Sequence, residues 1–348
     1  MLTCLGGMHK VYIELTEHCN LNCKSCFRSN LSHLPVHMGK EVFEKVLSAV
    51  ACTETVVVGG VGEPTLHPGF GRCSQALAHE NMEITSNAYE WDDGIIETLV
   101  SFYKKVTVSV DGLPCTFSNV RCFDFDIMAK NVKKLVERKK EAKSKFPFIH
   151  AQLVLTTENI KDIKELIPML KRIGFQKLII SNLLPQNECD KDKIVYSQHV
   201  PKETRDYVNS WYPIGSVNQL PIKLPQLQLK TERRCNFVET NSVFITADGN
   251  AAPCYRFAHD GQEYVFGRKK SVRAYYFGNV SDMDISEIWR QKNYESFRLQ
   301  NYADRYPSCV DCDNNECCDY INTSEADCMA NVPSCADCLW SRGFVECP

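Results

Sequence analysis

The sequence predicts an α/β fold, in which an open, partial (β/α)6 barrel is followed by a small cysteine-rich C-terminal domain. From Val11 to about Pro185, short β-branched runs alternate with amphipathic stretches of helical period, and this alternation is typical of βαβ units. Chemically notable residues recur at the ends of the predicted strands, where a parallel barrel places its functional groups. Of the 19 cysteines, eight lie between Cys309 and Cys347, which indicates a C-terminal unit held together by cysteines.

The elements are expected in a fixed order along the chain. Strands are predicted over residues 11–16, 55–59, 82–86, 105–110, 149–155 and 177–181, each a short run rich in β-branched residues. Helices are predicted between them over residues 39–51, 70–79, 92–101, 125–143 and 159–173, where apolar residues recur at helical spacing.

The rest of the chain reads differently. Residues 186–234 are richer in Pro and Gln and are expected to be irregular. A hairpin over 242–246 and 251–255 and a helix near 285–298 are expected next, with loops elsewhere. These patterns divide the chain into a barrel (1–200), a bridging region (201–234) and a cysteine-rich domain (235–348).

Composition excludes several functional classes. Charged residues make up 24% of the chain, hydrophobic residues 44%, and the net charge is −3, so no nucleic-acid partner is expected. There is neither a signal peptide nor a run of about 20 apolar residues, so a cytoplasmic protein without membrane contact is predicted. Clustered cysteines in a reducing cytosol favour thiolate ligands, although a secreted disulfide domain is the alternative.

The first motif is Cys19-x3-Cys23-x2-Cys26, directly after the first predicted strand. A cubane [4Fe-4S] cluster on three thiolates keeps one iron without a protein ligand, and that iron can chelate the amino and carboxylate groups of S-adenosylmethionine (SAM). Structural zinc is the alternative, but it takes four ligands and no fourth cysteine lies nearby.

This spacing, with the aromatic residue Phe27 after the third cysteine, resembles the signature of the radical SAM superfamily. The resemblance implies a radical SAM partial barrel that reductively cleaves SAM to a 5′-deoxyadenosyl radical. Later segments match the family in order, each at the end of a predicted strand. They imply SAM contacts from Phe27, Gly60, Gly62, Glu63, Ser86, Asn87, Ser109, Asp111 and Arg121. In particular, Glu63 and its glycines would receive the SAM ammonium, Ser86 and Asn87 would face the ribose, and Ser109 and Arg121 would meet the carboxylate. Outside this pattern a Gly-rich strand end is usually a turn, and an arginine is often part of a surface ion pair.

Cys235, Gly249 and Cys254 fit C-x13-G-x4-C, and Cys309-x2-Cys312-x5-Cys318 follows after a gap. This arrangement resembles the SPASM domain, which implies one or two auxiliary [4Fe-4S] clusters. The usual C-x3-C step is missing. The candidate ligands that follow instead are Cys328, Cys335, Cys338 and Cys347.

The spacing does not show which of these cysteines bind which auxiliary cluster, and one arrangement is preferred. It assigns Cys309, Cys312, Cys318 and Cys347 to one cluster and Cys235, Cys254 and Cys328 to the other. Cys335 with Cys338 would supply a fourth ligand or a separate metal site. A zinc site on Cys309, Cys312, Cys335 and Cys338 is the alternative.

Several phrases narrow the resemblance, among them residues 181–185, 230–235, 252–256 and 333–340. Together they resemble the radical SAM maturases associated with tungsten-cofactor oxidoreductases of the aldehyde ferredoxin oxidoreductase type. This implies a peptide, protein or cofactor substrate, with a tungsten-dependent oxidoreductase as partner, and an electron donor such as ferredoxin or flavodoxin.

Two other functions stay open at this point. One is a ribosomal peptide maturase that forms thioether or carbon–carbon crosslinks, although no separate peptide-binding domain is expected before Val11. The other is a non-catalytic iron-sulfur or zinc scaffold. No general base is identified, because Tyr255 stands where related dehydrogenating enzymes have an acid. Tyr255, Arg256 and Asp248 are candidates for substrate contact.

Overall fold

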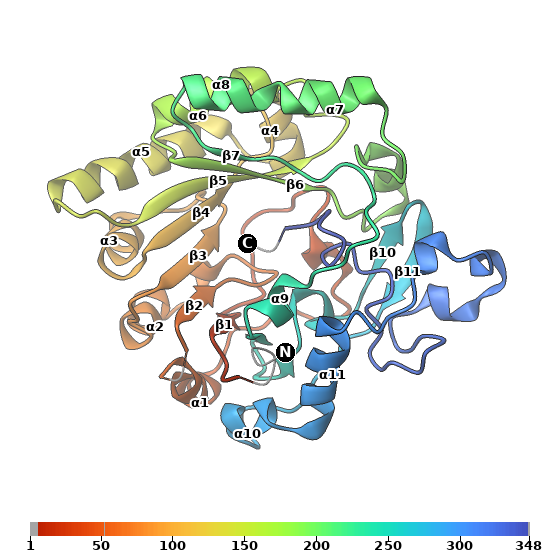
Figure 1. Ribbon diagram of the computed structural model, residues 1–348. Coiled ribbons are helices and arrows are strands. Elements are labelled where there is room, and N and C mark those ends of the chain that lie inside the picture. Colours follow the sequence, from red (N-terminus) through yellow and green to blue (C-terminus); the bar gives the residue numbers. More distant parts are fainter. Residues whose placement is uncertain (1–5, 52, 347–348) are drawn as a thin grey trace.

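The computed structural model describes residues 6–51 and 53–346 and contains a curved sheet flanked by helices (Figure 1). The sheet has nine strands in the order β7-β6-β5-β4-β3-β2-β1-β8-β9. All six strands predicted for the barrel are present and pair in parallel with their sequence neighbours. Their bounds are β1 (Lys10–Ile13), β2 (Thr55–Val58), β3 (Met82–Ser86), β4 (Lys105–Ser109), β5 (Phe148–Leu155) and β6 (Lys177–Asn182).

The five predicted helices are also present, on the outer side of the curved sheet (Figure 1). They are α1 (Lys40–Val50), α2 (Phe70–Ala76), α3 (Asp93–Phe102), α5 (Phe125–Glu141) and α6 (Ile163–Ile173). The last of these buries Ile163, Leu166, Leu170 and Ile173, whose spacing of three to four residues forms one apolar stripe. Helix α3 begins after Asp92, whose carboxylate accepts a hydrogen bond from the Ile95 N–H. The predicted α/β barrel is therefore confirmed.

The segment expected to be irregular contains regular structure, so that expectation was wrong. Helices α7 (Lys202–Asn209) and α8 (Trp211–Val217) lead into β7 (Ile222–Lys223), which pairs in parallel with β6. Trp211 is fully buried and anchors this unit on the barrel. Pro213 and Gly215 inside α8 lower its helix propensity, which hid the helix from a periodicity argument. A further helix that was not predicted, α4 (Pro114–Arg121), follows β4.

The predicted hairpin exists as β8 (Ser242–Ile245) and β9 (Ala251–Ala252), but it belongs to the barrel sheet. Strand β8 pairs in parallel with β1, from Lys10 beside Ser242 to Ile13 beside Ile245. The main sheet therefore continues past residue 234, where we expected a domain boundary.

The remaining C-terminal elements are short. A helix α9 (Asn236–Glu239) precedes β8, and the single helix expected near 285–298 is divided into α10 (Ile285–Trp289) and α11 (Lys292–Tyr302). An antiparallel pair, β10 (Gly261–Val265) and β11 (Arg268–Val272), replaces an expected loop. The 3-10 turns are η2 (Phe27–Asn30), η3 (Pro64–Leu66), η4 (Glu188–Lys193), η5 (Tyr255–Phe257), η6 (Cys309–Asp311), η7 (Asn315–Cys317) and η8 (Asp319–Asn322).

The C-terminal segment returns to the barrel. The Phe344 carbonyl accepts hydrogen bonds from the backbone and side chain of Asn182 at 3.1 and 3.0 Å, and the Glu346 N–H donates to Ser181 Oγ at 3.0 Å. The cysteine-rich part is thus attached to the carboxyl end of β6. Among the residues described, no helix has the length and apolarity to cross a membrane.

Candidate functional site

A cavity of about 270 Å³ opens at the carboxyl ends of β1 to β6. It is lined by Cys19, Cys23 and Cys26 and by every residue for which a SAM contact was predicted: Phe27, Gly60, Gly62, Glu63, Ser86, Asn87, Ser109, Asp111 and Arg121. The fold thus brings together residues that are spread over about a hundred positions. Asn182 also lines this cavity, and its buried Oδ1 has no hydrogen-bond partner among the described residues, so the wall presents an unsatisfied acceptor.

The three loop cysteines are suited to a metal cluster. Burial raises the pKa of Cys19 to about 11, with smaller contributions from the charges of Glu63, Cys26 and Cys23. Burial also raises the pKa of Cys23, although the nearby Arg121 opposes this shift. Thiols held in this way become thiolates when a metal displaces their protons. The residues present therefore fit a cluster bound by three thiolates.

Glu63 is held by the protein itself. Its side chain is 3% exposed, and it accepts hydrogen bonds from Ser86 Oγ and the Asn87 N–H, both at 2.7 Å, and from Thr65 Oγ1 at 2.8 Å. Burial raises the pKa of this carboxyl, and these hydrogen bonds lower it again in part. In this structure Glu63 fixes the ends of β2 and β3 relative to each other.

The glycines of the same segment are required by close backbone packing. A Cβ on Gly62 would overlap the Thr16 carbonyl oxygen and the backbone of Glu17, and a Cβ on Gly60 would overlap the Glu14 side chain. The chain after β2 therefore packs directly on the chain after β1. We expected the glycines to permit close approach of SAM, whereas the contacts seen here are with the protein's own first loop.

Arg121 and Asp111 form an ion pair in the cavity wall. Arg121 Nε donates to Asp111 Oδ2 at 2.5 Å, while Asp111 Oδ1 accepts from the Val154 N–H at 2.8 Å. Burial acts against the charged guanidinium, but Asp111 and Cys23 together raise the pKa of Arg121. Arg121 Nη1 lies 4.0 Å from Cys23 Sγ. The ion pair thus holds a permanent cation beside the loop cysteines.

A second cavity, of about 390 Å³, lies at the opposite end of the barrel and contains Cys235, Cys254, Cys335 and Cys338. Burial raises the pKa of Cys235 to about 12 and those of Cys254 and Cys335 well above their usual value, and the charges of the neighbouring cysteines add to these shifts. These four thiols form one group. The preferred sharing combined Cys235 and Cys254 with Cys328 and left Cys335 and Cys338 as a fourth ligand or a separate site, whereas the structure places Cys335 and Cys338 around the same cavity as Cys235 and Cys254.

Cys328 lies close enough to Cys309 for its charge to act on that thiol. Burial raises the pKa of Cys309 to about 12, and the charge of Cys328 contributes to that shift. Cys309 packs with Cys318, and Cys312 lies at the end of the same 3-10 turn. Cys347, which we expected to join this group, lies outside the described residues. The two pairs of the alternative zinc pattern fall in different groups, because Cys335 and Cys338 are in the barrel cavity.

Five residues line both cavities, and two of them are aromatic: Gln152, Tyr255, Trp340, Val345 and Glu346. The Tyr255 hydroxyl donates a hydrogen bond to the Gly60 carbonyl. The ring of Phe27 lies 6.5 Å from that of Tyr255 and 6.1 Å from that of Trp340. Aromatic side chains therefore form part of the wall between the loop cysteines and the second cysteine group. Trp340 had no predicted role.

Of the residues considered for substrate contact, Arg256 is excluded by its environment. Its side chain is 2% exposed and pairs with the equally buried Glu263 at 2.6 Å. Asp248 is exposed in the turn between β8 and β9. Of the three residues, only Tyr255 lines the cavity of the loop cysteines Cys19, Cys23 and Cys26.

Known proteins resemble this chain both in sequence and in fold. Residues 235–313 match the SPASM family model, described as an iron-sulfur cluster-binding domain. The chain is 37% identical, over 98% of its length and 97% of the other's, to a protein of Pyrococcus furiosus named tungsten-containing aldehyde ferredoxin oxidoreductase cofactor-modifying protein. Among solved structures, it resembles anSMEcpe with bound AdoMet (TM-score 0.62, 16% identity, 96% of this chain and 95% of that one). It also resembles Streptococcus suis SuiB bound to S-adenosylmethionine (TM-score 0.61, 16% identity, 91% and 74%). At such low identity the structural matches show a shared fold.

Proposed function

Because the chain belongs to the family of the tungsten-containing aldehyde ferredoxin oxidoreductase cofactor-modifying protein, we propose that it is a radical SAM enzyme that matures a tungsten-dependent oxidoreductase. The substrate is the cofactor or the polypeptide of that oxidoreductase. The observation that carries the proposal is the whole-length relationship, together with a cavity in which all the candidate SAM contacts converge on three cysteines.

Different residues of the cavity of the loop cysteines would hold the cluster and SAM. Cys19, Cys23 and Cys26 hold the cluster, which with SAM supplies reductive cleavage of the sulfonium when bound. Arg121, oriented by Asp111, offers guanidinium donors to the SAM carboxylate. Glu63 acts as a positioning residue that keeps Ser86 and Asn87 at the ribose side.

Two auxiliary [4Fe-4S] clusters would occupy the two groups of C-terminal cysteines. One is held by Cys235, Cys254, Cys335 and Cys338, the other by Cys309, Cys312, Cys318 and Cys328. Each group has a buried cation nearby. The charge of Arg256 acts to lower the pKa of Cys335, and the charges of Lys270 and Arg268 act to lower the pKa of Cys309, in both cases against the larger rise that burial causes. A positive charge in a low-dielectric site stabilises an anionic cluster, so a full thiolate set with such neighbours favours electron transfer.

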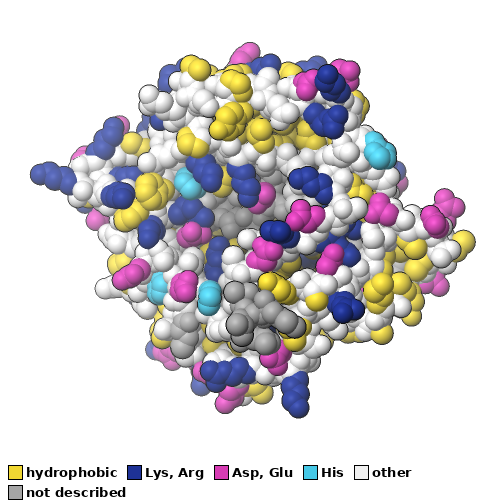
Figure 2. Space-filling view, in the orientation of Figure 1, with side chains coloured by type: hydrophobic (Ala, Val, Ile, Leu, Met, Phe, Trp, Pro, Cys, Tyr) yellow, Lys and Arg dark blue, Asp and Glu magenta, His cyan; other side chains and the backbone are white. Residues whose placement is uncertain are grey.

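An acidic electron carrier such as ferredoxin or flavodoxin would dock at the second cavity, the one that contains Cys235, Cys254, Cys335 and Cys338. Lys10, Lys105, Lys223 and Arg234 line it together with the first auxiliary cysteine group. Figure 2 shows Lys and Arg side chains around the hollow centre of this face, interspersed with Asp and Glu. Glu239 and Glu346 also line the cavity, and Lys223 pairs with Glu346 at 2.6 Å. Opposite charges steer such carriers to their site, and salt screens the effect.

Removing the positive charges of two of these lining residues is expected to slow the reduction of the enzyme's clusters by the carrier. The variant Lys223→Gln with Arg234→Gln should be reduced about tenfold more slowly by an acidic ferredoxin at low ionic strength, with the difference vanishing in high salt. Stopped-flow absorbance of the clusters measures this rate. The matched control is Lys133→Gln with Lys140→Gln, two exposed positions on α5. Equal slowing by both double variants would mean that the carrier docks elsewhere.

The maturation role is tested with the partner enzyme. A tungsten-dependent aldehyde oxidoreductase made without the maturase should gain activity when it is incubated anaerobically with the reconstituted protein, SAM and a reductant. Mass spectrometry of its cofactor and its polypeptide should show the altered component, with one 5′-deoxyadenosine formed for each modification. Cleavage of SAM without any change in the oxidoreductase would contradict the proposed substrate while leaving the radical SAM chemistry intact.

A further inference from the structure

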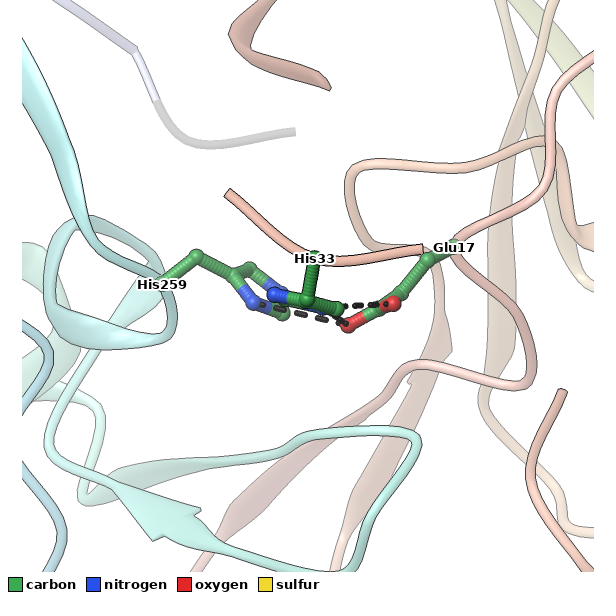
Figure 3. A group of neighbouring side chains, drawn as sticks. All are labelled: Glu17, His33 and His259. Atoms are coloured by element: carbon green, nitrogen blue, oxygen red, sulfur yellow. Dashed lines mark hydrogen bonds and ion pairs between the residues drawn. The ribbon is translucent and has the colours of Figure 1, made fainter. Parts of the chain in front are cut away.

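A group of side chains outside both cavities converges from three separate segments. Glu17 lies in the loop after β1, His33 follows the turn η2, and His259 follows η5 in the C-terminal part (Figure 3). One ligand atom from each of the three lies within 4.8 Å of the other two. Glu17 is 1% exposed, and the His259 side chain 10%.

We propose that Glu17, His33 and His259 bind a divalent first-row transition metal, with Glu14 orienting His259. His33 Nε2 lies 3.0 Å from Glu17 Oε2, and His259 Nδ1 lies 3.6 Å from Glu17 Oε1. Bonds of about 2.0–2.1 Å at tetrahedral angles place two zinc ligands about 3.3 Å apart, between these two separations. Two imidazoles and one carboxylate suit zinc or ferrous iron, and they leave a coordination position open.

Glu14 gives His259 the orientation that a metal ligand needs. The Glu14 carboxylate accepts from His259 Nε2 at 2.9 Å and is itself fixed by the Val61 N–H at 2.8 Å. In the neutral tautomer that has Nε2 as the donor, Nδ1 carries the lone pair and lies 3.6 Å from Glu17 Oε1. A carboxylate that binds the far nitrogen of a ligating histidine is the usual outer partner in protein metal sites.

Charge gives a second reason for a cation here. Glu14 and Glu17 are both buried, at 0% and 1% exposure, and neither forms an ion pair with a Lys or Arg in the described part of the chain. Asp248 and Asp260 add negative charge around them, since both contribute to the raised pKa of Tyr276, which burial mainly causes. Arg273 pairs with Asp260 and not with the glutamates. Buried carboxylates in excess over cations are costly, and a divalent metal compensates them.

The site is separate from the cysteine groups, so its metal can be measured in the fully reconstituted protein. We would dialyse the iron-loaded protein anaerobically against Zn²⁺ and determine zinc and iron by elemental analysis. The wild-type protein should bind one zinc per chain in addition to its iron. The variants His33→Asn and Glu17→Gln should lose this zinc at concentrations that saturate the wild type, while their iron stays unchanged.

Two further variants separate this site from its neighbours. Glu14→Gln removes the outer partner but no ligand, and should weaken zinc binding about 10- to 100-fold. His37→Asn removes an exposed histidine of the same loop, which stacks on His18 and lies outside the group, and should change nothing. A wild-type protein that binds no zinc would overturn the proposal and leave the group as an ion pair. Zinc lost equally in His37→Asn, or retained in both ligand variants, would overturn it as well.

Discussion

Replacing Cys19, Cys23 and Cys26 by alanine is expected to lower the iron content from about 12 to about 8 per chain and to abolish formation of 5′-deoxyadenosine. The reason is that these cysteines line the cavity that contains every candidate SAM contact, whereas the C-terminal groups lie outside it. Two four-iron clusters should therefore survive, and with them the visible absorbance of the C-terminal part. Iron and sulfide analysis after anaerobic reconstitution, followed by chromatography of the SAM products, measures both effects.

The matched control for this experiment is a triple alanine variant of Cys115, Cys122 and Cys189, three exposed cysteines outside all the groups. It should keep both its iron and its activity. If the Cys19, Cys23 and Cys26 variant retained its full iron, the assignment of the loop to a cluster would be wrong. If wild type held about 4 iron together with zinc, the loop cluster would stand and the auxiliary clusters would fall.

The second large effect concerns the division of the C-terminal cysteines. The double variant Cys335→Ala, Cys338→Ala is expected to lose about 4 iron, because both thiols belong to the group of Cys235 and Cys254. Adding Cys235→Ala and Cys254→Ala to it should cost no further iron, since one cluster is lost only once. Adding Cys309→Ala and Cys312→Ala should instead remove about 4 more.

Cys328 distinguishes this division from the arrangement that was preferred on the sequence alone. Because the charge of Cys328 acts on Cys309, Cys328→Ala should weaken the cluster of Cys309 and leave that of Cys235 unaffected. Its iron loss should therefore add to that of the Cys335 and Cys338 double variant. Absence of any additional loss would return Cys328 to the group of Cys235 and contradict the structure.

Much of the fold was predictable because it rests on local periodicity. The six barrel strands begin and end within three residues of their predicted bounds, since a buried parallel strand is a short β-branched run and its crossover helix has an apolar stripe. Cys19, Cys23 and Cys26 were recognisable as candidate cluster ligands for a similar reason, because three cysteines within eight residues form a spacing pattern that the sequence shows directly. Helix α8 escaped prediction because its proline and glycine weaken the local signal. Helix α7 contains neither residue, so its apolar spacing was missed in the sequence.

By itself, the sequence determined the barrel, the three-cysteine loop and the presence of a cysteine-rich C-terminal part, all of which depend on residues near one another in the chain. Only the tertiary structure decided how distant segments meet. It joined Cys335 and Cys338 to Cys235 and Cys254, added β8 to the barrel beside β1, and brought Glu17, His33 and His259 together. The physical reason is that ligand sharing and charge compensation arise from long-range packing, and loops without periodicity carry no local record of the partners they will contact.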